Sequence, residues 1–232
     1  NTCSVTSEAE RKAKQTIRKI KKKQPKSKII VTGCAAQINP DHWISMPEVN
    51  HVIGNEEKIN QKFWLDLSEE KEEKIVVTDI MQLKKTSFHL TKSFNQQTRS
   101  FLQIQNGCDH RCTFCIIPFG RGNSRSVTVE SIIKNIKEAL KNNIQEIVLT
   151  GVDLTSWGRD FNKKKSLGFL LKSIFRSVPD IPRIRVSSLD PAEIDHEFMD
   201  VLANEERLLP HLHLSLQHGD DLILKRMKRR HL

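Results

Sequence analysis

Three of the five cysteines in the chain lie within one short stretch, NGCDHRCTFCIIPFGRGNSRS, over residues 106–126. Cys108, Cys112 and Cys115 are separated by three and then two residues, so their thiolates can converge on one face of a compact loop. Three cysteine ligands leave one iron of a 4Fe-4S cluster without a protein ligand, open to a substrate or cofactor. The spacing therefore favours an iron–sulfur cluster with one open coordination position.

A zinc ion is the competing ligand for the same loop. Zinc sites with three cysteines and one histidine are common, and His110 lies between the first two cysteines. His110 is only two residues from each of them, which makes it awkward to join them on one tetrahedral ion. Inert buried thiols are a third alternative, and the spacing alone leaves all three open.

The chain of 232 residues is basic, with 38 Lys and Arg residues against 28 Asp and Glu residues and a formal charge of +10. Such a charge is typical of proteins that bind nucleic acid, because phosphates attract Lys and Arg. The odd number of cysteines, without an evident export signal, argues against a disulfide-bonded secreted protein. No apolar run is long enough to cross a membrane, and we expect a cytoplasmic protein.

The first part of the chain alternates between helix and strand patterns. Thr6 begins a segment with capping residues and apolar residues at helical spacing, and Pro25 ends it. The β-branched run over residues 28–34 is typical of a buried strand, and residues 51–55 indicate a second strand, followed by a helix. These patterns predict an α/β domain over residues 1–81.

A polar stretch without sustained periodicity follows, and it predicts a linker over residues 82–98. The alternation then resumes over residues 99–232. Strand patterns occur at 100–105, 146–151, 183–189 and 211–217, and helix patterns at 128–141, 167–177 and 193–203. Four strand–helix units in a row predict a parallel sheet with helices outside, curled into a barrel or part of one.

The cysteine loop follows the first strand of this second alternation, and there it resembles the cluster-binding loop of the radical S-adenosylmethionine (SAM) superfamily. In that superfamily the residue before the last cysteine is typically aromatic and lies close to the SAM adenine, and Phe114 has this position. The resemblance implies that SAM binds the open iron through its amino and carboxylate groups. Cys108, Cys112 and Cys115 are then the metal ligands and the catalytic residues.

Two other stretches are similar to the methylthiotransferases of that superfamily. NTCSVT at residues 1–6 and TGCAAQ at 32–37 resemble two of the three cysteine motifs in the domain that precedes the radical SAM domain. These motifs hold an auxiliary 4Fe-4S cluster, so Cys3 and Cys34 match two of its three ligands. Taken alone, either cysteine could be a small core residue. The third ligand is expected upstream of Asn1, so we expect a fragment, incomplete also at the C-terminal end of the barrel.

Within that family the resemblance is strongest to enzymes that act on threonylcarbamoyladenosine beside the tRNA anticodon. It rests on IIPFGRGNSRS, VLTGVDLTSWG and LHLSLQHGDDLILKRMKRRH, although His218 stands where we expect a serine. The resemblance implies a transferase that inserts a methylthio group at carbon 2 of the modified adenine. Sister enzymes that modify isopentenyladenosine in tRNA, or an aspartate of a ribosomal protein, are the alternatives.

The resemblance also implies cofactor-binding residues at the ends of later strands. Gly151, Val152 and Asp153 correspond to the stretch that approaches the SAM amino group, and a carboxylate beside an ammonium group is favourable. Ser188, with Ser187, could meet the ribose or carboxylate of SAM. The alternatives are a turn cap for Asp153 and a simple strand end for the two serines.

Basic residues form three blocks, Lys19–Lys23, Lys163–Lys165 and Lys225–Arg230, and Arg121 and Arg125 follow the cysteine loop. Phosphate contacts through these residues would weaken as salt rises. A solvated face is the alternative for the first two blocks. Arg121 and Arg125 are the stronger candidates because they come directly after the loop.

The resemblance implies two partners, the anticodon stem-loop of tRNA and a flavodoxin-type electron donor, with no membrane contact and a monomeric state. A zinc-dependent RNA-binding module without catalysis is a hypothesis of a different class, because it uses the same cysteines and the same positive surface. A chain without one auxiliary ligand and without the RNA-binding domain could also cleave SAM yet fail to thiolate tRNA.

Overall fold

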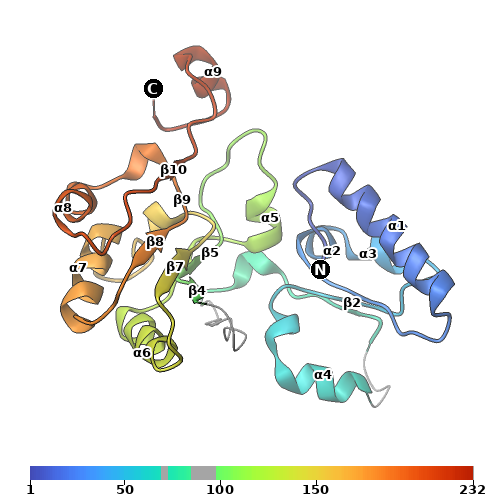
Figure 1. Ribbon diagram of the computed structural model, residues 1–232. Helices are drawn as coiled ribbons and strands as arrows, with labels where there is room; N and C mark the ends of the chain where they lie inside the picture. Colours follow the sequence, from blue (N-terminus) through green and yellow to red (C-terminus); the bar gives the residue numbers. More distant parts are fainter. Residues whose placement is uncertain (69–72, 85–97, 232) are drawn as a thin grey trace. The chain divides into compact units, whose positions relative to one another are not determined.

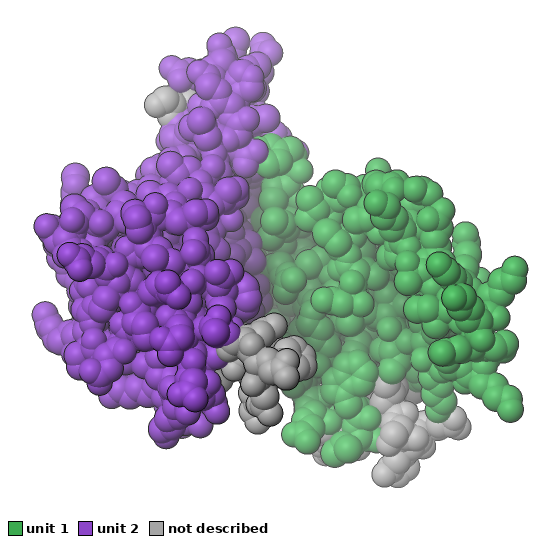
Figure 2. All heavy atoms as spheres, viewed as in Figure 1, with its two compact units in different colours: residues 1–83, 114–123 green, residues 84–113, 124–232 purple. Residues whose placement is uncertain are grey.

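The structure is a computed structural model that describes residues 1–68, 73–84 and 98–231. The chain divides into two compact units (Figure 2): unit 1 comprises residues 1–83 and 114–123, and unit 2 comprises residues 84–113 and 124–232. The predicted linker over 82–98 falls mostly outside the described residues. The domain boundaries at 81 and 99 stay a prediction.

Unit 1 contains a parallel sheet in the order β1-β2-β3, formed by Ile30–Val31, His51–Ile53 and Ile75–Val76 (Figure 1). Four α-helices lie within residues 1–68, namely α1 Ser7–Lys23, α2 Cys34–Ile38, α3 Pro40–Ile44 and α4 Gln61–Ser68. Thr6 caps α1, because its hydroxyl accepts a hydrogen bond from the N–H of Ala9 at 3.1 Å. The two predicted strands and the first predicted helix are confirmed, although the strands are shorter than expected.

Three further short helices complete the described part of unit 1. These are the 3₁₀ helices η1 Glu57–Ile59 and η2 Ile80–Gln82 and the helix α5 Ile117–Arg121. The helix α5 follows the cysteine loop in the sequence, yet it packs against α2 and η2. Residues that come directly after the loop therefore belong to the first unit.

Unit 2 contains a parallel sheet in the order β4-β7-β8, formed by Arg99–Gln103, Glu146–Thr150 and Ile184–Val186. Leu102 pairs with Leu149, and Leu149 pairs with Val186. Two smaller pairs are β5 Gln105–Asn106 with β6 Arg125–Ser126, which is antiparallel, and β9 Ser188–Leu189 with β10 His213–Leu214, which is parallel. The predicted parallel α/β architecture is confirmed, and the closure into part of a barrel stays a proposal.

The helices of unit 2 begin where the sequence supplies capping side chains. Thr128 caps α6 Val129–Leu140, Ser166 caps α7 Leu167–Ser177 and Asp195 caps α8 His196–Asn204. Their apolar faces and the sheet form one core, which includes Ile132, Leu149, Trp157, Leu170, Ile174 and Ile184. No helix in the described ranges is long and apolar enough to cross a membrane.

Two predicted elements are shorter than the sequence pattern indicated. The strand predicted over 211–217 is only two residues long, because tight turns with i to i+2 hydrogen bonds follow it, from Leu216 to Leu214 and from His218 to Leu216. The helix predicted over 193–203 starts at His196, because the 3₁₀ helix η4 Pro191–Glu193 precedes it. Glu193 therefore lies in η4 and not in α8.

Candidate cofactor site and its supporting charges

The buried side chain of Gln105 fixes the start of the cysteine loop in unit 2. Its Nε2 donates hydrogen bonds to the carbonyl of Gly107 at 2.7 Å and to the hydroxyl of Ser124 at 2.9 Å. Its Oε1 accepts from the backbone N–H groups of Val152 and Asp153, both at 2.9 Å. One amide group thus joins the loop after β5 to the turn after β7.

His110 lies in the loop between two carboxylates. Its Nε2 is 3.0 Å from Oδ2 of Asp153 and 3.6 Å from Oε2 of Glu193, although neither contact has the direction of a good hydrogen bond. Asp153, and then Glu193, raise the pKa of His110 to about 9, against the opposing effect of burial. Because an imidazolium offers no lone pair, His110 would have to lose this proton before it could bind zinc.

Asp153 is 6% exposed and fully engaged by the protein. Its carboxylate accepts from the hydroxyls of Thr155 at 2.9 Å and Ser156 at 2.6 Å. Burial alone would raise the pKa of Asp153, but His110, Ser156 and Thr155 hold it below its usual value. Asp153 therefore stays ionised and supports the cysteine loop through His110.

Glu193 forms ion pairs with arginines from separate parts of unit 2. Arg159 donates to its Oε1 at 2.6 Å and Arg230 at 2.5 Å, while the hydroxyl of Ser156 lies 3.0 Å from its Oε2. Ser156 also approaches Asp153, and its single proton can serve only one carboxylate at a time. The other carboxylate keeps its remaining donors, which are Thr155 for Asp153 and the two arginines for Glu193. Because Ser156 and His110 lie between the two carboxylates, the cluster is a coupled set of charges.

Cys108 and Cys112 each lie close to one charged side chain. Cys108 Sγ is 4.0 Å from Oδ2 of Asp153, and Cys112 Sγ is 3.7 Å from Nη1 of Arg229. In the described part of unit 2, the donor atoms of Cys108, His110 and Asp153 all lie within 4.8 Å of one another. Neither cysteine forms a disulfide with a described residue, so both thiols can become ligands.

Cys115 and Phe114 group with unit 1 rather than with the other two cysteines. The division of the chain falls between Thr113 and Phe114. Cys115 is a free, half-buried thiol, and Phe114 is exposed. The set of three ligands accordingly rests on their spacing in the sequence.

The two N-terminal cysteine motifs come together in unit 1. Thr2 forms a parallel bridge with Gly33, and the N–H of Cys34 donates to the carbonyl of Thr2 at 3.0 Å. The hydroxyl of Thr2 also accepts from the N–H of Ala36 at 3.2 Å. Cys3, which is exposed, therefore follows directly on the residue that is bridged to the Cys34 motif.

Cys34 begins α2 against the backbone of α5. A Cβ added to Gly120 would lie 2.8 Å from Cβ of Cys34, so only glycine allows this approach. Asn55 donates to the carbonyl of Gly120 at 2.7 Å, and the same Nδ2 is 3.9 Å from the Cys34 sulfur. Lys58 donates to the side-chain oxygen of Asn55 at 2.6 Å. Burial, and after it the charge of Arg121, lowers the pKa of Lys58.

The serine candidates differ in their contacts. Ser188 Oγ lies 2.8 Å from Nδ1 of His213, so it is engaged by the next strand. Ser187 Oγ is buried and has no hydrogen-bond partner among the described residues, which leaves it available to a ligand. Gly151 is tightly enclosed, since an added Cβ would lie 2.8 Å from Leu154.

The basic candidates also differ in exposure. Arg125 is 2% exposed, so the expected phosphate contact of this side chain is not supported. Lys163 and Lys164 are exposed, as are Lys225 and Arg226 in the last block. Arg229 and Arg230 belong to the block Lys225–Arg230, for which the sequence predicts phosphate contact, whereas the structure pairs both with buried carboxylates, Asp190 and Glu193.

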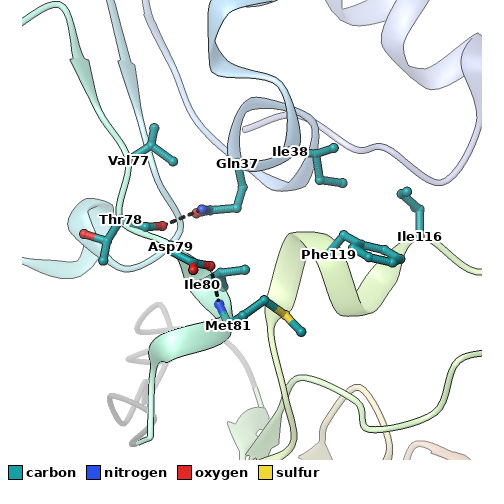
Figure 3. Close-up of a pocket in the computed structure, with 9 residues that line it drawn as sticks. All are labelled: Gln37, Ile38, Val77, Thr78, Asp79, Ile80, Met81, Ile116 and Phe119. Atoms are coloured by element: carbon teal, nitrogen blue, oxygen red, sulfur yellow. Dashed lines mark hydrogen bonds between the residues drawn. The ribbon is translucent and has the colours of Figure 1, made fainter.

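A cavity of about 580 Å³ opens beside α2 within unit 1 (Figure 3). The side chain of Gln37 donates to the carbonyl of Thr78 at 2.9 Å, and Asp79 accepts from the N–H of Met81 at 2.9 Å. The remaining lining side chains are mainly apolar and include Ile38, Val77, Ile80, Ile116 and Phe119. The cavity suits an apolar or planar group.

Comparison with family models gives two matches along the chain. Residues 102–232, more than half of the chain, match the model described as the radical SAM superfamily. Residues 1–54 match the model described as uncharacterized protein family UPF0004. The two matches correspond to the parts of the sequence that carry the two sets of cysteines.

Curated relatives are similar to the chain from end to end. The threonylcarbamoyladenosine tRNA methylthiotransferase MtaB of Rickettsia prowazekii is 49% identical over 231 residues, and MtaB of Bacillus subtilis is 35% identical over 232. A tRNA-2-methylthio-N(6)-dimethylallyladenosine synthase of Lawsonia intracellularis is 30% identical over 246 residues. Each alignment covers 100% of this chain but only 54%, 51% and 54% of the relative, so the chain spans about half their length.

A solved structure shares the fold at low sequence identity. The radical S-adenosylmethionine methyltransferase TsrM of Kitasatospora setae matches with a TM-score of 0.68 and 15% identity. The match covers 94% of this chain and 46% of TsrM. At this identity the likeness concerns the fold alone.

Proposed function

Because this chain belongs to the radical SAM superfamily, we propose that it acts in a methylthiotransferase that modifies threonylcarbamoyladenosine at carbon 2, beside the anticodon of tRNA. The observation that carries this proposal is the similarity to MtaB enzymes along the whole chain, at 49% identity for the Rickettsia relative. The substrate region is the anticodon stem-loop. The sister substrate, isopentenyladenosine, is less favoured, because the relative named for it is 30% identical.

Cys108, Cys112 and Cys115 are the residues that we propose as ligands of the SAM-binding 4Fe-4S cluster. Their thiols form no disulfide among the described residues and fit this group, because thiolates are the ligands that iron–sulfur clusters use and three of them leave one iron open. When bound and reduced, such a cluster would supply the electron for the reductive cleavage of SAM. The chain contributes the fixed loop backbone, through Gln105, and the charges around the sulfur atoms.

Cys3 and Cys34 are the proposed ligands of the auxiliary cluster. The bridge between Thr2 and Gly33 supports this assignment, since it brings the two cysteine motifs together. The close approach of Gly120 and the amide of Asn55 leave a defined environment around the Cys34 sulfur. The group held there would supply the sulfur that is transferred.

For SAM itself we propose Phe114, the turn of Gly151, Val152 and Asp153, and Ser188. The exposed ring of Phe114 supports contact with a planar adenine. Asp153 is engaged by His110 and two hydroxyls, so its contribution is chiefly to hold the cysteine loop. We further propose a flavodoxin-type electron donor, a monomeric state and a cytoplasmic location.

A zinc site is the second candidate, since the donor atoms of Cys108, His110 and Asp153 gather within 4.8 Å. Full-length protein reconstituted anaerobically with iron and sulfide separates the two. We expect brown protein that carries iron and acid-labile sulfide and loses one cluster in Cys112→Ala, with Cys3→Ala/Cys34→Ala as the matched control for the other site. Colourless protein with stoichiometric zinc would sink the enzyme proposal.

The substrate is tested by mass spectrometry of tRNA nucleosides from cells with and without the full-length protein. We expect the methylthio derivative of threonylcarbamoyladenosine to disappear with the protein and to return with the wild-type gene but not with Cys112→Ala. Loss of the methylthio derivative of isopentenyladenosine instead would assign the sister substrate.

A further inference from the structure

Arg229 is a buried cation that directly approaches the cysteine loop. Its side chain is 7% exposed, and its Nη1 lies 3.7 Å from the sulfur of Cys112. Its Nη2 lies 3.0 Å from Oδ2 of Asp190 and 2.8 Å from the carbonyl of Ser215. One guanidinium therefore joins a ligand sulfur to a buried carboxylate, with all four residues in unit 2.

One N–H donor of Arg229 takes no part in these contacts. Its Nε is buried and has no hydrogen-bond partner among the described residues. A buried polar group without a partner is costly, and natural structures seldom keep one without a reason. The Arg229 guanidinium would stabilise an anionic group beside the Cys112 sulfur, such as the inorganic sulfide of a cluster.

The backbone around Arg229 also fixes its place against the loop. The N–H of Thr113, next to Cys112, donates to the carbonyl of Met227 at 3.2 Å. The helix α9 Asp221–Arg226 is capped by Asp220 and leads directly into this segment. The contact between Arg229 and Cys112 is thus held from both the backbone and the side-chain partners.

We propose that Arg229 is a positioning residue that raises the reduction potential of the cluster bound by the cysteine loop. The proposal rests on the cluster assigned under the proposed function. A cation that donates to a ligand sulfur favours the state with one more electron, and hydrogen bonds to sulfur are a recognised control of cluster potentials. The guanidinium can donate to sulfur and carboxylate together, because it has five N–H donors in a rigid fork.

The alternative is that Arg229 only neutralises Asp190. A purely structural ion pair would change the thermal stability of the protein when removed, but it would leave the electron affinity of the cluster unchanged. The readout must therefore be the reduction potential rather than activity.

The test uses full-length protein with a reconstituted cluster, titrated with dithionite and followed by electron paramagnetic resonance. The variants are Arg229→Gln, which removes the charge, Arg229→Lys, which keeps the charge but not the fork, and Arg226→Gln as control. Arg226 lies in the same segment, and its side chain is exposed. Iron and sulfide content and circular dichroism are measured for each protein.

We expect Arg229→Gln to lower the ratio of reduced to oxidised cluster about tenfold at a fixed solution potential, which equals 59 mV for a one-electron couple. Arg229→Lys should give a smaller decrease, and Arg226→Gln none. Midpoints that are equal in wild type and Arg229→Gln, with full clusters, would overturn the proposal. If Arg229→Gln loses its cluster, Arg229→Lys decides, and an unchanged midpoint there counts against it. A wild-type protein that binds no iron would instead contradict the proposed function.

Discussion

The two cysteine sites of this chain are supported in different ways. In unit 1, Cys34 is placed by backbone pairing with Thr2 and by the close approach of Gly120. In unit 2, the cysteine loop is held by charged side chains, chiefly His110 and Arg229. One site therefore depends on steric fit and the other on buried charge, so different substitutions should damage them.

The largest expected effect comes from filling the space beside Gly33. Gly33 has φ of 107°, and an added Cβ would lie 2.3 Å from backbone atoms of Thr2. Gly33→Val should therefore destabilise unit 1 by roughly 3 kcal/mol or more, by backbone strain and steric clash. Chemical denaturation measures it, with Gly219→Ala as control, because no atom lies within 4 Å of a Cβ added there. Equal effects in the two variants would contradict a sterically determined site.

The next effect concerns the charges around His110. Asp153→Asn removes the nearer of its two carboxylates and leaves a buried imidazolium facing Glu193 alone. Breaking a buried pair from one side costs about 3 kcal/mol, so the free energy of unfolding of unit 2 should fall by that order. Urea denaturation is the measurement, and Asp200→Asn, which breaks the exposed pair with Lys172, is the control expected to change little. A stability equal to that of the control would show that the charges do not hold the loop.

A smaller effect is expected from crowding Cys34 at the auxiliary site. In Gly120→Ala the new Cβ would lie 2.8 Å from Cβ of Cys34 and 3.3 Å from its Cα, so the backbone of α2 or α5 has to shift. We expect a loss of about 1–2 kcal/mol in unfolding free energy and a weaker auxiliary site. Iron analysis of Gly120→Ala in a Cys112→Ala background reports the auxiliary site alone. An iron content equal to that of the Cys112→Ala protein would show that Gly120 does not support the auxiliary site.

The smallest effect depends on pH. Burial alone would raise the pKa of Glu146, at the start of β7, but Arg185, Arg99 and Arg183 hold it below its usual value. Since the folded pKa is depressed, this stabilisation is present above the ordinary Glu range near pH 4.5 and is lost as pH falls through the folded pKa. Glu146→Gln should lower stability at pH 7 and flatten its decline below pH 4.5. Unfolding curves at pH 7 and 3 that shift equally in both proteins would contradict this.

Patterns that are local in the sequence predicted much of this molecule. The capped helix after Thr6, the strand–helix alternation and the spacing of Cys108, Cys112 and Cys115 each depend on residues a few positions apart. Such patterns reflect hydrogen bonding and burial within single elements, so one sequence carries enough information for them.

The charged support of the loop could not be predicted in the same way. Arg229 is 117 residues from Cys112, and Glu193 is 83 residues from His110, so only the folded chain brings them together. In the sequence, Arg229 belongs to the basic run Lys225–Arg230, which indicates phosphate contact rather than contact with a cysteine. Likewise, nothing local indicates that α5 packs against α2, because the short segment carries no distinctive period.

Metal analysis of the full-length Cys3→Ala/Cys34→Ala variant tests the central claim most directly, because only the cysteine loop of the described chain can then bind a cluster through cysteine. After anaerobic reconstitution we predict about four iron and four sulfide per chain, as for one 4Fe-4S cluster. The reduced protein should also cleave SAM to methionine and deoxyadenosine. One zinc per chain, without iron and without SAM cleavage, would contradict the account.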